Sequence, residues 1–114
     1  MDEINFNVDQ GADFRRLIRL KDESRNAIDL SGRIFVGGVK QNFRSNKILF
    51  TIELLVQDQV EFPGEIHLRI YADDTRNLRI SDPTEFHYDI KQIKSSEETI
   101  ILAGKIVVVP RVSK

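Results

Sequence analysis

Apolar residues alternate with polar ones along most of the chain. The clearest segment spans 48–56, where one face carries Ile48, Phe50, Ile52, Leu54 and Val56 and the other carries Thr51 and Glu53. A period of two is typical of a strand that covers a core with one face. The same pattern predicts half-buried strands at 66–70 and 86–90, and shorter apolar runs predict strands at 4–8, 14–20 and 33–40.

Two runs near the end of the sequence are apolar without alternation. Ile100-Ile101-Leu102 and Ile106-Val107-Val108-Val109 predict a last strand that is either covered on both faces or in contact with a partner through its outer face. Pro110 should end the pairing of this strand, because proline has no N–H to donate to a ladder. In the strand at 33–40, the pair Gly37-Gly38 predicts a bulge or a close approach of another segment.

Polar turns separate these strands at short intervals. They lie at 22–26, 42–46, 63–64, 81–83 and 95–98, a spacing that suits short strands and leaves no room for repeated crossover helices. The segment 72–78 has a helical pattern and is short enough to be a single turn. We therefore predict one domain over residues 1–114, all-β in class: an antiparallel immunoglobulin-like β-sandwich of about seven or eight strands with at most one short helical turn.

Charge and cysteine content narrow the function. The 114 residues include 17 Lys and Arg and 18 Asp and Glu, so no basic field draws the protein to nucleic acid or to an anionic membrane. Without cysteine there is no disulfide, thiolate metal site or thiol nucleophile. The start, Met1-Asp2-Glu3-Ile4, lacks the features of a secretion signal, and no apolar run is long enough to span a membrane. We expect the protein to fold in a cytoplasm.

Residues that could carry chemistry are few and scattered. His67 and His87 occupy polar-face positions, and neither has a second histidine at metal-ligand spacing. The acidic pairs at 22–23, 73–74 and 97–98 are adjacent residues in polar turns, which suits neither a catalytic carboxylate pair nor a calcium loop. Neither Gly-x-Ser-x-Gly nor a phosphate-binding loop is present. The sequence therefore predicts no enzyme, no cofactor, no metal and no small-molecule substrate.

The densest basic stretch contains Arg15, Arg16, Arg19 and Lys21. In a strand, Arg15, Arg19 and Lys21 share a face that Arg16 does not, and Phe14 falls on the core face. Sheets that bind nucleic acid combine such a stripe with exposed aromatic rings, which this stripe lacks. A solvated face or a salt-bridging contact with a protein partner is therefore favoured over nucleic acid.

Several short motifs occur in the order found in a known family of domains. They are Asp9-Gln10-Gly11-Ala12-Asp13, Leu20-Lys21-Asp22, Ile28-Asp29-Leu30-Ser31-Gly32, Thr75 with Leu78, Tyr88-Asp89-Ile90 and Gly104-Lys105-Ile106-Val107-Val108. On these residues the chain resembles the small β-sandwich domain of tailed-phage virion proteins, notably the amino-terminal domain of upper baseplate and tail-fibre-anchoring proteins. It departs from that pattern in having Arg19-Leu20 where a tryptophan often precedes Lys-Asp.

The resemblance implies a non-enzymatic structural protein of a virion, assembled in the host cytoplasm and located in the tail, baseplate or neck. Its partners would be other virion proteins and copies of itself in a symmetric assembly. Because an edge strand can accept a partner strand, we expect contacts at the first and last strands, at Ile4, Phe6, Val8, Ile106, Val107, Val108 and Val109. The same runs equally fit ordinary sheet core.

A different class of function remains open. A free-standing immunoglobulin-like module that binds carbohydrate or protein would have the same strand pattern. Carbohydrate binding would need exposed aromatic rings on one face, and Tyr71 is the main spare aromatic residue.

Overall fold

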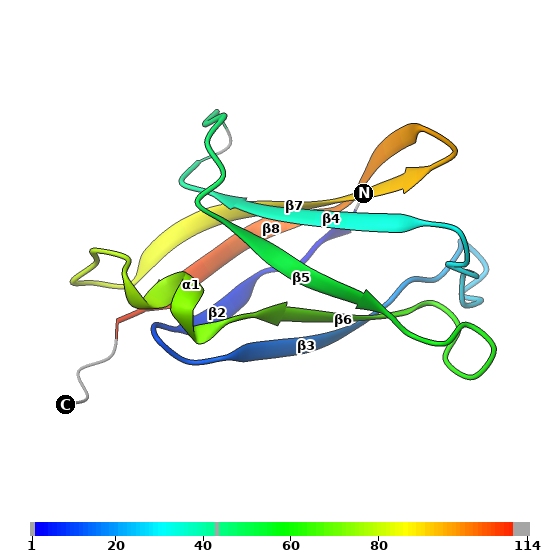
Figure 1. Ribbon diagram of the computed structural model, residues 1–114, viewed down its shortest axis with the longest axis horizontal. Helices are drawn as coiled ribbons and strands as arrows, with labels where there is room; N and C mark the ends of the chain where they lie inside the picture. Colours follow the sequence, from blue (N-terminus) through cyan, green and yellow to red (C-terminus); the bar gives the residue numbers. More distant parts are fainter. Residues whose placement is uncertain (1, 43, 111–114) are drawn as a thin grey trace.

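The computed structural model describes residues 2–42 and 44–110, which form eight strands and one short helix (Figure 1). In chain order these are β1 (Asp2–Glu3), β2 (Phe6–Asp9), β3 (Phe14–Arg19), β4 (Ile34–Lys40), β5 (Phe50–Val56), β6 (Glu65–Ile70), α1 (Ala72–Arg76), β7 (Thr84–Lys94) and β8 (Glu97–Val109). The predicted all-β class is confirmed, and α1 lies inside the segment where a helical turn was expected.

The sheet is mixed rather than purely antiparallel. Hydrogen-bonded neighbours follow the order β1-β8-β7-β4-β5-β6-β3, and β2 also pairs with β8. Five ladders are antiparallel, whereas β1 and β2 run parallel to β8. The antiparallel prediction therefore needs correction at the amino-terminal strands, because side-chain alternation carries no information on the direction in which a neighbouring strand runs.

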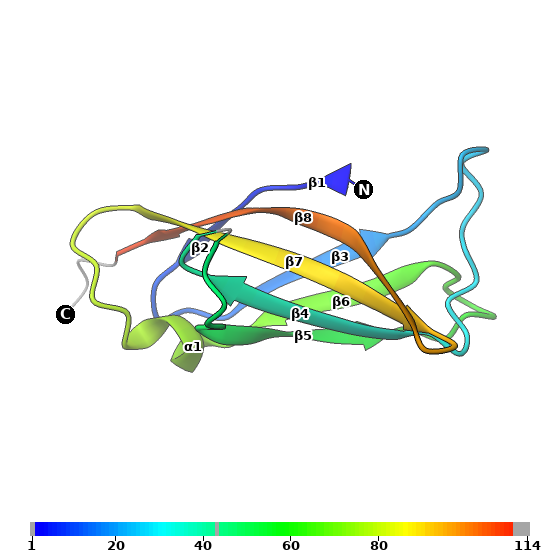
Figure 2. The ribbon, with the colours of Figure 1, turned by 90° about the horizontal axis from the view of Figure 1, so that it is seen from above.

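Strand β5 joins two layers. Its first half, 50–52, pairs with β4, and its second half, 53–56, pairs with β6. We call sheet A the layer of β1, β2, β8, β7, β4 and the start of β5, and sheet B the layer of β3, β6 and the end of β5. Figure 1 shows β5 crossing from the upper layer to the lower one, and Figure 2 shows the strand order of sheet A. Within the described strands β2 and β3 do not pair, so the ladder stays open between them.

Inward-facing side chains of both sheets form one core. Every second residue of 66–70 and of 86–90 is at most 5% exposed, as alternation predicts. Burial of one such apolar side chain stabilises the fold by ~1.5–3 kcal/mol. Ile48 and Val56, also expected on the core face, are instead 52% and 38% exposed. Ile48 precedes β5, and Val56 ends β5 after that strand has crossed into sheet B.

Strand β8 is an inner strand of sheet A. It pairs with β7 along one side and with β1 and β2 along the other. Its pairing ends at Val109, directly before Pro110, as predicted. A bulge lies at Ile101, since Ile90 pairs with Leu102 while the next residue, Lys91, pairs with Ile100.

The pair Gly37-Gly38 marks a close approach and not a bulge. A Cβ atom on Gly37 would lie 3.2 Å from Cβ of Ile52, and one on Gly38 would lie 3.3 Å from Cδ1 of Ile48. Strand β4 pairs without interruption at both glycines. The missing side chains therefore let Ile52 pack against β4 from inside and Ile48 from outside.

The turn after β2 holds helix α1 in place. Nε2 of Gln10 donates hydrogen bonds to the carbonyl oxygens of Thr75, at 3.1 Å, and Leu78, at 2.7 Å. The N–H of Gly11 donates to Oγ1 of the fully buried Thr75 at 2.8 Å. Two of the motifs noted in the sequence, the Gln-Gly turn and the Thr-Leu crossing, thus form one packed unit, and these residues have a structural role.

Candidate protein-binding surfaces

Most of the contact positions predicted from the sequence lie in the ladder between β2 and β8. Phe6 pairs with Ile106 and Val8 pairs with Val108. These four side chains are at most 2% exposed, so the alternative of ordinary sheet core fits them. The other three positions are less buried: Val107 and Val109 are half-buried on the outer face of β8, and Ile4 is 38% exposed.

Titratable side chains do not gather into a metal centre in the described part of the chain. No group of three His, Cys, Asp or Glu residues there is placed to hold a metal ion. His67 is exposed on the outer face of sheet B, and His87 is half-buried, with Nε2 at 3.8 Å from Oε1 of Glu85. Nor does any helix among these residues have the length and apolar character needed to cross a membrane. The outer faces of the two sheets remain as candidate sites.

The outer face of sheet A carries a cluster of β-branched side chains, four of them exposed and one, Ile93, half-buried. We call it the isoleucine face, and it consists of Ile34, Val36, Ile48, Ile93 and Ile100. Ile34 and Val36 are 61% and 48% exposed. Ile34 lies opposite Ile93, and Lys91 lies between Val36 and Ile100 in the next row. Opposite residues of paired strands share a face, so the four strand residues form one surface. Ile48 joins this surface because its side chain packs over Gly38.

The bulge at Ile101 brings Ile100 to this surface. From Leu102 to Val108 the even-numbered residues of β8 point into the core. The extra residue in β8 reverses that alternation, so Ile100 shares the outer face with Lys91 and is 42% exposed. The charged residues of the same face, Lys91, Asp89 and Glu98, include both signs.

Sequence reasoning missed the isoleucine face, although a signal for it was present. Ile34-Phe35-Val36 is apolar without alternation, as are the runs that drew attention to the last strand. In β4 the inward residue is Phe35, which is 9% exposed, and its two neighbours point outward. When one face of a strand is solvated, an uninterrupted apolar run must place apolar side chains on that face. The run at 34–36 is therefore the sequence signal for the isoleucine face.

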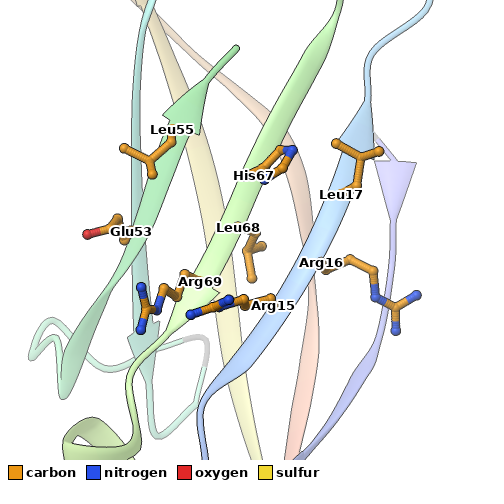
Figure 3. Close-up of a pocket in the computed structure, with 8 residues that line it drawn as sticks. All are labelled: Arg15, Arg16, Leu17, Glu53, Leu55, His67, Leu68 and Arg69. Atoms are coloured by element: carbon orange, nitrogen blue, oxygen red, sulfur yellow. The ribbon is translucent and has the colours of Figure 1, made fainter. Parts of the chain in front are cut away.

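The outer face of sheet B presents rows of side chains across β3, β6 and β5. Arg15, Arg69 and Glu53 form the first row, and Leu17, His67 and Leu55 form the second. These residues line a shallow groove with a volume of about 470 Å³ (Figure 3). Leu17 and Leu55 are 40% and 52% exposed. Since Arg19 and Glu65 form the next row, the row in which two leucines flank His67 lies between two charged rows.

Four side chains beside the groove bind one another. Nη2 of Arg69 lies 3.2 Å from Oδ2 of Asp13, and the Arg69 guanidinium lies 4.2 Å from the ring centroid of Tyr71. The Tyr71 hydroxyl donates a 2.6 Å hydrogen bond to Oε2 of Glu53, which raises the pKa of Tyr71. A hydrogen bond from the backbone N–H of Ala72 lowers the pKa of Asp13. One face of the Tyr71 ring and its hydroxyl are thus already occupied, which argues against the carbohydrate-binding alternative.

Arg16 lies on the inner side of β3, where the ladder is open towards β2. Its guanidinium carbon lies 5.3 Å from the ring centroid of Phe6 and 5.8 Å from that of Phe14, within the range of cation–π attraction. Figure 3 shows Arg16 turned towards β2 and away from Arg15. The prediction that Arg16 does not share the face of Arg15 and Arg19 is confirmed.

No family of known proteins matches the chain, and no curated protein matches it. Among solved structures, murine CRIg is 11% identical with a TM-score of 0.46, over 94% of this chain and 92% of that chain. A 2,6-sialyltransferase from Photobacterium sp. JT-ISH-224 is 13% identical with a TM-score of 0.39, over 96% of this chain. This chain spans 18% of the length of that enzyme. At these TM-scores neither similarity bears on function.

Proposed function

We propose that this domain is a non-enzymatic structural protein that joins copies of itself and other proteins in a larger assembly, a tailed-phage particle. The motif resemblance supports the location in a phage particle. The exposed surfaces of the two sheets support the binding of other copies and other proteins. We also propose that the fold is an immunoglobulin-like sandwich. In support, two sheets linked by β5 enclose one core.

The isoleucine face is the observation that carries the proposed self-association. Contiguous β-branched side chains on a sheet surface gain stability when a partner removes them from water. The charges among them, Lys91, Asp89 and Glu98, are of both signs, so two copies of this face meet without a single-sign charge cluster. A two-fold pair in which each copy presents the same face therefore covers the apolar surface of both.

Self-association is tested by sedimentation velocity on the purified protein across a range of concentrations. The wild-type protein should form a dimer whose dissociation constant changes little with salt, because apolar side chains make most of its contacts. Val36→Lys should raise the dissociation constant about thirtyfold or more, as for a central interface residue. Val60→Lys, at a position that is 94% exposed in the loop between β5 and β6, is the control and should leave the dimer unchanged. A protein that stays monomeric at every concentration would overturn this part of the proposal.

The virion setting needs its own test. Tailed-phage particles produced by cells that express this protein should contain it in stoichiometric copies, measured by quantitative mass spectrometry of purified particles. Its absence from intact particles would refute the virion setting. The remaining candidate would then be a free-standing protein-binding module that uses the same surfaces.

A further inference from the structure

We propose that the open edge of β3 binds an extended acidic segment of another protein as an added antiparallel strand. This second site goes beyond self-association and lies on a different part of the molecule from the isoleucine face. Strand β3 pairs with β6 on one side, and within residues 2–42 and 44–110 no strand pairs with its other side. An unpaired edge of this kind is the usual site of strand addition.

The backbone hydrogen bonds show which residues of β3 face the open edge. Gln57 N–H donates to the carbonyl oxygen of Glu65 at 3.0 Å, so the odd-numbered residues of β6 bond to β5. Leu20 N–H donates to the carbonyl oxygen of Gly64 at 2.8 Å, so the even-numbered residues of β6 bond to β3. Partners in an antiparallel ladder alternate between bonded and non-bonded pairs. The N–H and carbonyl groups of the odd residues 15, 17 and 19 therefore point to the edge.

The side chains at the same three positions set the charge of the edge. Arg15 lies directly opposite Arg69, a like-charge pair that destabilises a sheet unless an anion is near. Asp13 forms an ion pair with Arg69 and its charge also acts on Arg15, but among the described residues no carboxylate lies within ion-pair distance of Arg15. Arg19 is 62% exposed and lies 3.4 Å from Glu65. An added strand with a carboxylate opposite Arg15 supplies an ion-pair partner that Arg15 lacks among the described residues, and a second carboxylate opposite Arg19 adds to the negative charge of Glu65.

Between the two arginines the edge is apolar. Leu17 is exposed beside the groove, in one row with His67 and Leu55. A residue of the added strand that lies opposite Leu17 extends this row by one position, so an apolar side chain there would cover Leu17. The edge thus fits a segment with the pattern acidic, any, apolar, any, acidic.

A second copy of this chain that pairs symmetrically about Leu17 does not fit the same edge. In an antiparallel pair of β3 strands centred on Leu17, Arg15 of each copy lies opposite Arg19 of the other. Like charges directly opposite each other destabilise a sheet, and this arrangement contains two such pairs. The charge of β3 therefore favours a different, acidic partner, whereas the isoleucine face favours a second copy.

The test uses the full-length chain, labelled with ¹⁵N, and a blocked peptide of sequence Ser-Glu-Val-Leu-Thr-Glu-Ser. The Glu peptide should bind more weakly as salt is added, and hydrogen exchange of the Arg15, Leu17 and Arg19 amides should slow on binding. A peptide with Lys in place of both Glu residues should bind at least about tenfold more weakly. Arg15→Glu should weaken binding of the Glu peptide about tenfold and should favour the Lys peptide. Arg44→Glu makes the same charge change in an exposed loop and should have no effect.

Three results would overturn the proposal: no binding of the Glu peptide, equal binding of the Glu and Lys peptides, or binding that leaves exchange of the three edge amides unchanged. Protection of those amides that grows with protein concentration in the absence of peptide would also overturn it, because a second copy would then occupy the edge. All measurements are repeated in Val36→Lys. Loss of the dimer with peptide binding intact separates this site from the self-association proposed above.

Discussion

The hydroxyl of Tyr88 donates a hydrogen bond of 2.6 Å to the carbonyl oxygen of Ile4, a residue 84 positions away in the sequence. Tyr88 lies directly opposite Gly104, and a Cβ atom on Gly104 would lie 2.1 Å from that same oxygen. The segment between β1 and β2 therefore packs against β8 only where a glycine leaves room and a tyrosine supplies a donor.

Replacement of Tyr88 by phenylalanine should lower the free energy of unfolding by ~1–2 kcal/mol, because the carbonyl oxygen of Ile4 loses its partner in a partly buried position. Urea denaturation measures the change. Tyr71→Phe is the matched control: its hydroxyl bonds to Glu53 at the surface, so its loss should cost less than about 0.5 kcal/mol. Equal effects at the two positions would contradict the assigned role of Tyr88.

Tyr88 should also make the free energy of unfolding depend on pH in the alkaline range. Burial raises the pKa of Tyr88 above its ordinary value of 10.0, so the folded state keeps the proton that the unfolded state loses. The stabilising contribution is complete below pH 10.0 and is lost as pH rises through the pKa of the folded state. The free energy of unfolding should therefore fall above that pH. Tyr88→Phe should have a shallower slope, and an unchanged slope would rule out Tyr88 as its source.

Gly104→Ala should destabilise the domain by ~2–4 kcal/mol, because the added methyl group collides with the backbone of Ile4, which cannot give way without loss of the β1 and β2 pairing. Gly38→Ala is a control in another strand of the same sheet. There the nearest atoms belong to the exposed side chain of Ile48 at 3.3 Å, and the cost should be under about 1 kcal/mol. Thermal denaturation of both variants measures which substitution destabilises the domain more.

Thr75→Val should cost ~1–3 kcal/mol, since the Gly11 N–H is left without its acceptor at a fully buried side chain. Thr51→Val makes the same change on an exposed face of β5 and should be close to neutral. Chemical denaturation compares the two. If the variants are equally stable, the contact between the Gln-Gly turn and helix α1 contributes nothing to the fold.

The hairpin between β7 and β8 should accept a stabilising change. Ser95 and Ser96 have φ values of 51° and 67°, the left-handed region that a type I′ turn requires at both central positions. Replacement of this pair by Asn-Gly should raise the free energy of unfolding by ~0.5–1 kcal/mol, because these residues adopt such angles at lower cost. Ser95→Val should lower the free energy of unfolding. A melting temperature that falls in the Asn-Gly variant would refute the turn assignment.

The sequence by itself determined the class of the fold and the inner face of most strands. Alternation at 66–70 and 86–90 identified buried side chains correctly, Pro110 marked the end of β8, and the short helix at α1 was expected. These predictions succeed because the side chain at each position reports locally on whether it faces water or core.

Only the tertiary structure decided which strands are neighbours and which surfaces stay open. By sequence, Phe6 and Val8 fit a partner contact and the core equally well. The pairing of β2 with β8 places both side chains in the core. The edge at Arg15 is open because of the strand order. Ile100 points outward because β8 contains one extra residue at the bulge. Backbone N–H and carbonyl groups are the same at every residue except proline, so the chain does not encode locally which edge each strand meets; the packing of the whole core selects it.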